Sequence, residues 1–87
     1  MRKRVVVHGR VQGVFFRDST RRRAEAAGVA GWVANRPDGT VEAVLEGDAD
    51  AVEALMRWLH DGPRGADVER VEVEESEPEG LTGFDVR

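Results

Sequence analysis

Residues 4–28 read RVVVHGRVQGVFFRDSTRRRAEAAG, and this stretch carries a strand signal, a glycine-rich loop and a helix signal in succession. The β-branched run Arg4–His8 predicts a largely buried strand, which two glycines interrupt. Residues 17–27 contain neither glycine nor proline, and Gly28 stands where a helix commonly ends in the left-handed conformation. The stretch therefore predicts a strand, a loop and a helix.

A second pair of strands is predicted directly downstream. Residues 30–35 and 40–46 have the apolar and β-branched composition of strands. The segment between them reads Arg36-Pro37-Asp38-Gly39, in which proline restricts φ and glycine accepts a positive φ. These residues predict a β-hairpin.

The clearest helical periodicity lies in the second half of the chain. Its apolar residues recur at i, i+3, i+4 and i+7, namely Val52, Leu55, Met56 and Leu59. Asp50 and Glu53 have the spacing of a capping box, and Gly62-Pro63 predicts the end of this second helix.

The last quarter of the chain predicts two further strands. Val71–Glu74 alternates as a half-buried strand does, and the acidic run over residues 74–79 is interpreted as a solvated loop. Phe84–Val86 predicts a short edge strand. The order β, α, β, β, α, β with a short final strand predicts the ferredoxin-like α+β fold, a two-layer sandwich with an antiparallel sheet and both helices on one face.

Length and composition restrict the classes of function. A chain of 87 residues is too short for two independent cores, so we expect a single domain over residues 1–87. No run of about 20 apolar residues is present, and the first valine run is too short for a signal peptide, which favours a cytoplasmic protein. The absence of cysteine excludes disulfides, thiolate metal sites and a cysteine nucleophile. His8 and His60 lack metal-ligand spacing, and we expect local structural roles for both.

Charge is distributed unevenly along the chain. The formal net charge is −4, yet residues 1–23 carry eight basic residues and one acidic residue. This asymmetry indicates an anion site near the N-terminus, for nucleic acid, a membrane surface or a phosphorylated ligand. Arg21-Arg22-Arg23 is interpreted as a solvated helix face without a function.

Residues 9–17 form the first candidate site. A strand followed by Gly9-Arg10-Val11-Gln12-Gly13-Val14-Phe15-Phe16-Arg17 and a helix can bring backbone N–H groups and a helix N-terminus together, an arrangement that binds anions. Arg17 in the first helical turn opposes the helix dipole, which a bound anion would explain. A salt bridge between Arg17 and a nearby acid is the alternative.

Residues 31–42, GWVANRPDGTVE, form the second candidate site. Taken alone, Asn35 before its turn is interpreted as a backbone-capping residue. Taken together, however, both segments resemble the paired signatures of the acylphosphatase family, a Gly-x-Val-Gln-Gly-Val-x-Phe-Arg loop and a Gly-aromatic-Val-x-Asn-x-x-Asp-Gly-x-Val-Glu hairpin. The similarity extends over the whole chain, including Gly62-Pro63 and the short final strand.

The resemblance implies hydrolysis of the carboxyl–phosphate bond of acyl phosphates. It implies catalytic roles for Arg17, which binds phosphate, and for Asn35, which positions the attacking water. The implied phosphate-binding residues are Gly9, Arg10, Val11, Gln12, Gly13, Val14 and Arg17. Because the leaving carboxylate is a weak base, no general acid is required, and arginine with N–H donors makes a metal dispensable. We therefore expect no cofactor and no metal site, while the general base stays unidentified.

The expected partners follow from this reading. They are a small acyl phosphate as substrate and inorganic phosphate as product and inhibitor, with no nucleic acid, no membrane and a monomeric chain. A non-catalytic anion or RNA binder is the alternative, but Phe15 and Phe16 flank the loop and Trp58 lies on a predicted helix, so a base-stacking sheet surface is not indicated. A module of a larger carbamoyl-transferring protein is a third possibility. Arg36-Pro37 leaves the acyl side of the pocket open.

Overall fold

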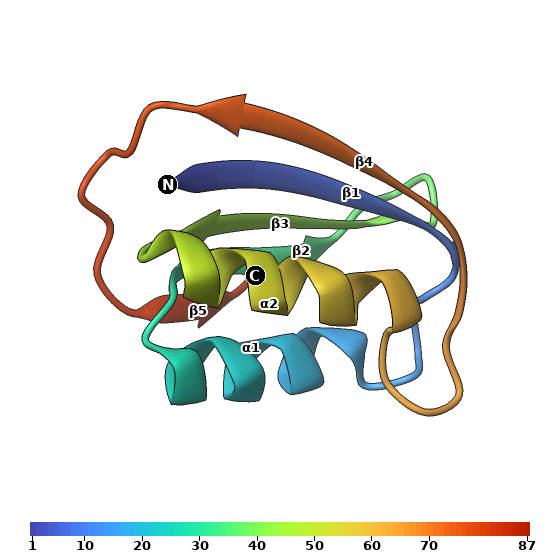
Figure 1. Ribbon diagram of the computed structural model, residues 1–87. Helices are drawn as coiled ribbons and strands as arrows, with labels where there is room; N and C mark the ends of the chain where they lie inside the picture. Colours follow the sequence, from blue (N-terminus) through green and yellow to red (C-terminus); the bar gives the residue numbers. More distant parts are fainter.

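Two helices lie side by side on one face of a five-stranded sheet in the computed structural model, which describes all 87 residues (Figure 1). In chain order the elements are β1 (Arg2–Arg10), α1 (Phe16–Ala27), β2 (Ala30–Asn35), β3 (Val41–Glu46), α2 (Ala49–Asp61), β4 (Asp67–Ser76) and β5 (Phe84–Val86). The strand order is β4-β1-β3-β2-β5. The predicted two-layer, ferredoxin-like α+β fold is therefore confirmed. Neither helix combines the length and apolar character that spanning a bilayer needs.

The direction of the last strand differs from the prediction. All other neighbouring strands pair antiparallel, but β5 pairs parallel to β2, with Gly31 opposite Phe84 and Val33 opposite Val86. The sheet is mixed rather than antiparallel. The loop after β4 crosses to the far edge of the sheet before β5 begins, and this crossing sets the direction of the strand (Figure 1).

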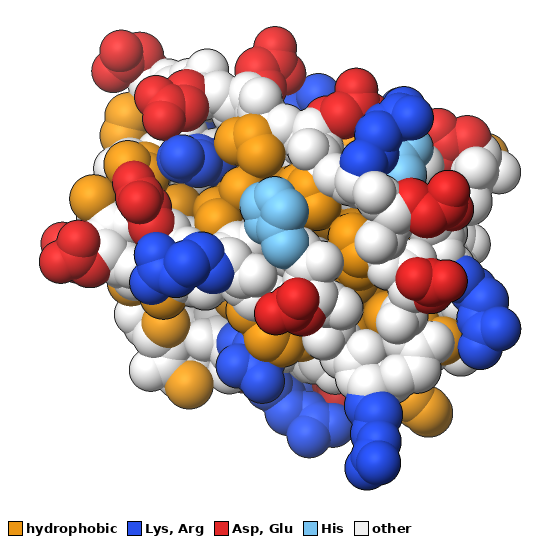
Figure 2. Space-filling model, turned by 45° about the vertical axis from the view of Figure 1, so that its right-hand side comes forward, with side chains coloured by type: hydrophobic (Ala, Val, Ile, Leu, Met, Phe, Trp, Pro, Cys, Tyr) orange, Lys and Arg blue, Asp and Glu red, His pale blue; other side chains and the backbone are white.

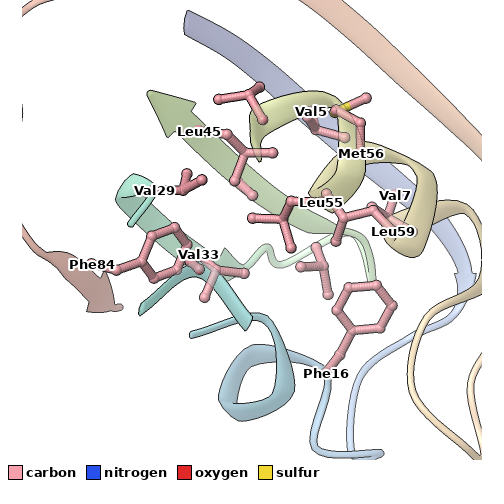
Figure 3. Close-up of a cluster of buried hydrophobic side chains, with 14 of the residues drawn as sticks. Val5, Val7, Phe16, Val29, Val33, Leu45, Leu55, Met56, Leu59 and Phe84 are labelled. Carbon is pink, nitrogen blue, oxygen red and sulfur yellow. The ribbon is translucent and has the colours of Figure 1, made fainter. Parts of the chain in front are cut away.

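The core lies between the sheet and the helices (Figure 3). Every second residue of the central strands points into it, for example Val5 and Val7 of β1 and Val33 of β2. Burial of each such side chain contributes about 1.5 to 3 kcal/mol. The apolar residues predicted to line one face of α2 are all buried, namely Val52, Leu55, Met56 and Leu59.

The two helices are joined through aromatic and cationic side chains. Phe16 at the start of α1 lies 5.8 Å from Trp58 of α2, measured between ring centroids. The guanidinium of Arg23 lies 4.6 Å from the centre of the Trp58 ring, a favourable cation–π distance. Arg21 and Arg22 both hydrogen-bond the carboxylate of Asp18. All three arginines of the predicted solvated face thus have partners within the protein.

The start of α2 corrects one local prediction. The helix begins at Ala49, and Asp48 is its N-cap residue, so Asp50 and Glu53 do not form a capping box. Asp50 lies within the first turn, where a carboxylate interacts favourably with the helix dipole. The backbone carbonyl of Asp48 accepts the N–H of Val52 at 2.9 Å.

The strand β4 is longer than predicted, and part of the acidic run belongs to it. Glu74 and Glu75 lie opposite Arg4 and Lys3 of β1 in the sheet register. The charged groups pair across the strands, at 3.2 Å for Arg4–Glu74 and 3.4 Å for Lys3–Glu75. Opposite charges in direct cross-strand contact stabilise a sheet, so these acidic residues form strand rather than loop.

The pairing between β1 and β4 becomes irregular at its other end, near Gly9. The register between β1 and β4 shifts between His8 and Gly9, where Gly9 has a φ of 131°. A Cβ atom at Gly9 would lie only 2.1 Å from the backbone oxygen of Asp67. Gly9 therefore lies within β1 and permits the close approach of β4 immediately before the candidate loop.

Candidate active site

The loop between β1 and α1 has an alternating backbone conformation. Gly13 has a φ of 73° and Phe15 a φ of 60°, while Val14 between them has a negative φ. Alternation of left-handed and right-handed residues turns successive N–H groups toward a common point and forms an anion-binding concavity. The loop geometry is therefore suited to an oxyanion.

The N–H groups of this loop are free of partners within the protein. No backbone N–H from Gln12 to Asp18 donates a hydrogen bond to a backbone or side-chain group, and the first that does is Ser19, to the carbonyl of Phe15 at 3.0 Å. Three of these N–H groups lack partners because they begin a helix. Strong donors without an internal partner are available to a bound anion.

Gln12 connects the loop to the hairpin. Its side-chain amide donates to the carbonyl of Arg36 at 2.8 Å and to that of Thr40 at 2.9 Å. The turn between β2 and β3 is itself held by Asp38, whose carboxylate accepts the backbone N–H of Thr40 at 3.0 Å and its hydroxyl at 2.6 Å. The two candidate segments are thus fixed relative to each other.

One pocket brings the predicted catalytic residues together. It has a volume of about 350 Å³ and lies where the loop, the start of α1, the end of β2 and β5 meet. Its lining residues are Val11, Gly13, Phe15, Phe16, Arg17, Asp18, Asn35 and Val86. Arg17 and Asn35, which are distant in sequence, therefore line the same pocket as the loop between β1 and α1.

Arg17 is the second residue of α1, and no acidic side chain pairs with it. Its guanidinium donates to the main-chain oxygen of Arg87 at 3.0 Å. The neighbouring acid, Asp18, is bound by Arg21 at 2.7 Å and Arg22 at 2.6 Å. These two hydrogen bonds lower the pKa of Asp18 and compensate its charge. The salt-bridge alternative for Arg17 is therefore absent, and its positive charge remains available to the pocket.

Asn35 is the last residue of β2 and is exposed to solvent. The side-chain hydrogen bonds of the following turn come from Asp38 rather than from Asn35. Thr40 hydrogen bonds also lower the pKa of Asp38 and keep its carboxylate ionised as an acceptor. The turn-capping interpretation of Asn35 thus has no support in the geometry.

Several other predicted phosphate-binding residues take part in the sheet, the core or the contact with the hairpin, although Val11 also lines the pocket. Gly9 and Arg10 belong to β1 and pair with β4. Val11 is fully buried, and the side chain of Gln12 is bound to the hairpin turn. From this part of the chain, the free donors that can reach an anion are the backbone N–H groups from Gln12 onward.

Four pocket-lining residues were not among the predicted site residues, namely Phe15, Phe16, Asp18 and Val86. Phe15 occupies a variable position of the loop signature, and Val86 was recognised only as part of an edge strand. The loop position next to Arg17 was the available signal for Phe15, while the contribution of Val86 depends on the crossing that brings β5 beside β2.

A larger hollow of about 500 Å³ lies on the face of the sheet that the helices leave uncovered. Several of its charged groups are paired: Arg4 binds Glu74 within the hollow and Glu42 beside it, and His8 binds Glu72. The hydrogen bond from His8 lowers the pKa of Glu72. His60 contacts the carbonyl of Met56 at 2.9 Å, so both histidines have local partners, as predicted.

The surface charges of the protein are mixed in sign. Acidic and basic side chains are interspersed over the face seen in Figure 2, with basic side chains gathered along its lower edge, the side on which α1 lies. Arg17, which lines the smaller pocket, has no acidic side chain as a partner and donates to the main-chain oxygen of Arg87.

Comparisons with known proteins agree with the geometry. The family model for acylphosphatase matches residues 3–86. The acylphosphatase of Rubrobacter xylanophilus is 66% identical over 87 residues, which are 99% of this chain and 79% of that protein. The acylphosphatase of Thermococcus kodakarensis is 59% identical over 86 residues, covering 99% of this chain and 94% of that one. The crystal structure of acylphosphatase from Bacillus subtilis superposes with a TM-score of 0.95 at 37% identity, over 99% and 97% of the two chains.

Proposed function

The chain belongs to the acylphosphatase family, whose activity is acyl phosphate hydrolysis, and we propose that it acts by direct in-line attack of a positioned water, without a metal ion. One observation carries the proposal: a single pocket is lined by residues of the loop with free N–H groups, by Arg17 and by Asn35. These groups supply, in turn, donors for the phosphoryl oxygens, a positive charge and a site for water.

The loop and Arg17 bind the phosphoryl group. Backbone N–H donors and a planar guanidinium can each contact different phosphoryl oxygens and stabilise the charge that spreads over them during displacement. Arg17 has five N–H donors and uses one on the carbonyl of Arg87, which orients it and leaves the others for phosphate. Gln12 holds the loop against the hairpin, so the donors need little rearrangement when the substrate binds.

Asn35 positions the nucleophile. Its amide oxygen accepts a hydrogen bond from the water and directs a lone pair of the water toward phosphorus without acting as a base. The oxygen–phosphorus bond of the water forms as the bond to the acyl oxygen breaks, and the electron pair leaves with the carboxylate. A carboxylic acid has a pKa of about 4, so the carboxylate departs without protonation. The proton of the water passes to a phosphoryl oxygen of the substrate.

An RNA-binding role has less support. Trp32 on the uncovered face of the sheet has its ring 4.6 Å from the guanidinium of Arg87, measured to the ring centre. Glu42 and Glu74 lie on the same face beside Arg4. Acidic side chains and one occupied aromatic ring are a poor surface for stacking nucleotides. We retain the small-molecule substrate.

The organisation of the chain is part of the proposal. A single domain over residues 1–87 is supported by coverage of 94% of the Thermococcus kodakarensis acylphosphatase. The monomeric state and the cytoplasmic location stay predictions, which size-exclusion chromatography and cell fractionation would test.

The decisive experiment measures inorganic phosphate released from acetyl phosphate, corrected for spontaneous hydrolysis. We expect turnover that is unchanged by a chelator and competitively inhibited by inorganic phosphate, because product and substrate share the loop. Arg17→Ala, purified in the same way, is the control for contaminating phosphatases. Loss of activity on chelation with recovery on adding a divalent metal would reject the metal-free reaction, and wild-type turnover no greater than that of Arg17→Ala would reject the assigned site.

A further inference from the structure

The hydrogen bond that orients Arg17 depends on a residue at the edge of the sheet. The guanidinium of Arg17 donates to the main-chain oxygen of Arg87 at 3.0 Å. Arg87 follows β5, which is only three residues long and is the outermost strand of the sheet on its side. The end of a short edge strand frays unless further contacts hold it. The orientation of Arg17 therefore depends on what holds Arg87 in place.

Two contacts with β2 hold Arg87. Its backbone N–H donates to the carbonyl of Val33 at 2.8 Å, as part of the parallel pairing of β5 with β2. Its guanidinium lies 4.6 Å from the centre of the Trp32 ring, a favourable cation–π distance, and forms no ion pair with an acidic side chain. The first contact fixes the nitrogen of Arg87 and the second fixes its side chain. Together they limit the rotation that would move its main-chain oxygen away from Arg17.

The strand register places Trp32 and Arg87 on the same face of the sheet. Trp32 lies opposite Asp85, and Arg87 is two residues further along the chain, so its side chain points to the same side as that of Asp85. Val33 is buried in the core between the sheet and the helices, so the neighbouring Trp32 points to the uncovered face. Trp32 does not line the pocket that contains Arg17. Any effect of its ring on that pocket therefore passes through Arg87.

We infer that Trp32 is a positioning residue for Arg17. The indole ring holds the side chain of Arg87, and the main-chain oxygen of Arg87 holds one N–H group of Arg17. The inference rests on the part of the proposed function that places phosphate at Arg17. A guanidinium that is already oriented loses less conformational freedom when phosphate binds. Loss of the ring contact therefore weakens phosphate binding and turnover together, because Arg17 contacts phosphate in the ground state and in the transition state.

The test measures the Kd of inorganic phosphate by titration calorimetry. Arg87→Ala removes the guanidinium from the Trp32 ring and keeps the main-chain oxygen. We expect the Kd of phosphate to rise about two- to fivefold, the range of an exposed cation–π contact, and kcat/KM for acetyl phosphate to fall by a similar factor. Trp32→Leu should give the same result, whereas Trp32→Phe keeps an aromatic face and should stay closer to the wild type. Arg23→Ala is the matched control, because Arg23 lies at the same distance, 4.6 Å, from the ring of Trp58 and does not line the pocket.

A double variant separates positioning from stability of the fold. Arg17→Ala removes the group that the Trp32 ring helps to orient, so adding Arg87→Ala to it should leave the already weakened Kd of phosphate unchanged. A rise of equal size with and without Arg17 would overturn the inference, because the contact would then act on the fold. A wild-type Kd in both Arg87→Ala and Trp32→Leu would also overturn it and leave the proposed function standing. Absence of acetyl phosphate hydrolysis by the wild type would overturn the proposed function, while the Kd values would still decide the role of Trp32.

Discussion

Arg17 and Asn35 line one pocket, and the proposed mechanism gives them different tasks. Arg17 carries a positive charge that no acidic side chain compensates, whereas Asn35 offers a neutral amide at the exposed end of β2. A charge binds phosphate before and during the reaction, while an amide that holds water matters mainly when the water attacks. Substitutions at the two positions should therefore have separable effects on binding and turnover.

The Arg17 prediction concerns both steps. Arg17→Ala should lower kcat/KM by about 10² to 10³-fold and weaken inhibition by inorganic phosphate, because the guanidinium contacts phosphate in the ground state and the transition state. Arg17→Lys should stay impaired, since a single ammonium cannot form two parallel hydrogen bonds. Arg22→Lys, on the same helix but paired with Asp18, is the matched control. Steady-state kinetics would measure these effects. Wild-type kcat and KM in Arg17→Lys would show that the two parallel hydrogen bonds of the guanidinium are not needed.

The Asn35 prediction separates binding from turnover. Asn35→Ala should lower kcat by about 10² to 10³-fold and leave the inhibition constant of inorganic phosphate nearly unchanged, because one oriented polar contact is lost only in the reaction. Asp38→Ala is the control, since Asp38 holds the turn through Thr40 and its loss should lower the melting temperature while turnover per folded molecule persists. An Asn35→Ala protein with a lower melting temperature and undiminished turnover would contradict the water-positioning role.

At the scale of elements, Glu46 connects the end of β3 to the segment that leads into β5. Its carboxylate accepts backbone N–H groups from Glu79, Gly80 and Leu81, at 3.1, 2.6 and 3.1 Å. Arg2 of β1 adds a fourth hydrogen bond at 3.2 Å. Burial raises the pKa of Glu46, but the three N–H groups and Arg2 outweigh it, so the pKa lies below its ordinary value. The ionised carboxylate thus holds the crossing segment in place.

This arrangement predicts a pH dependence of stability. Because the pKa of Glu46 is lower in the folded protein, its contribution is fully present above the ordinary value of 4.5 and is lost as pH falls below it, through the folded pKa. Glu46→Gln should therefore lower the free energy of unfolding at pH 7, and the difference from wild type should shrink toward pH 3. Urea unfolding at both pH values would measure it. Glu53→Gln, a change at an exposed carboxylate of α2, should show no such trend. If the stability difference between Glu46→Gln and wild type does not depend on pH, the role assigned to the ionised Glu46 carboxylate is wrong.

Elements with strong local patterns were predictable from the sequence. The apolar period of α2 and the Pro37-Asp38-Gly39 turn lie within short windows, and both appear as expected. The extent of β4 was not predictable in this way, because Glu74 and Glu75 resemble a solvated loop until Arg4 and Lys3 are placed opposite them. Such a pairing joins residues about 70 positions apart in the chain, and a local window does not contain it.

The site was predictable to a similar degree. The resemblance placed Arg17, Asn35 and the loop in one site, and the structure places them around one pocket. It could not distinguish a phosphate ligand from a residue that supports the loop. Gln12 matches the signature, yet its amide is bound to the hairpin turn, and only the three-dimensional arrangement shows this. The left-handed backbone of Phe15 was likewise invisible, because no local residue pattern requires it.

At the scale of the whole molecule, most of the uneven charge is compensated internally. β1 lies between β3 and β4, and its first cations pair with acids of these strands, as Arg2 does with Glu46 and Lys3 with Glu75. The excess of basic residues near the N-terminus therefore reflects mainly residues that form ion pairs within the protein, rather than an extended anion site. The proposed anion site uses only Arg17 from this group of cations, together with the free N–H groups of the loop.

This difference predicts how the folded molecule responds to phosphate. A ligand that binds only the folded state stabilises it by RT ln(1 + [L]/Kd), so inorganic phosphate at ten times its Kd should add about 1.4 kcal/mol. For a domain of this size that corresponds to a rise in melting temperature of about 5 to 10 °C. Sodium chloride of equal ionic strength controls for screening of the surface ion pairs. Arg17→Ala should lose most of the rise in phosphate and keep the response to chloride, because it removes the guanidinium that lines the pocket and leaves the charge pairs of the sheet in place. Calorimetry would measure the melting temperatures. An equal rise in melting temperature in Arg17→Ala would mean that phosphate stabilises the protein through those charge pairs and that the loop is not its binding site.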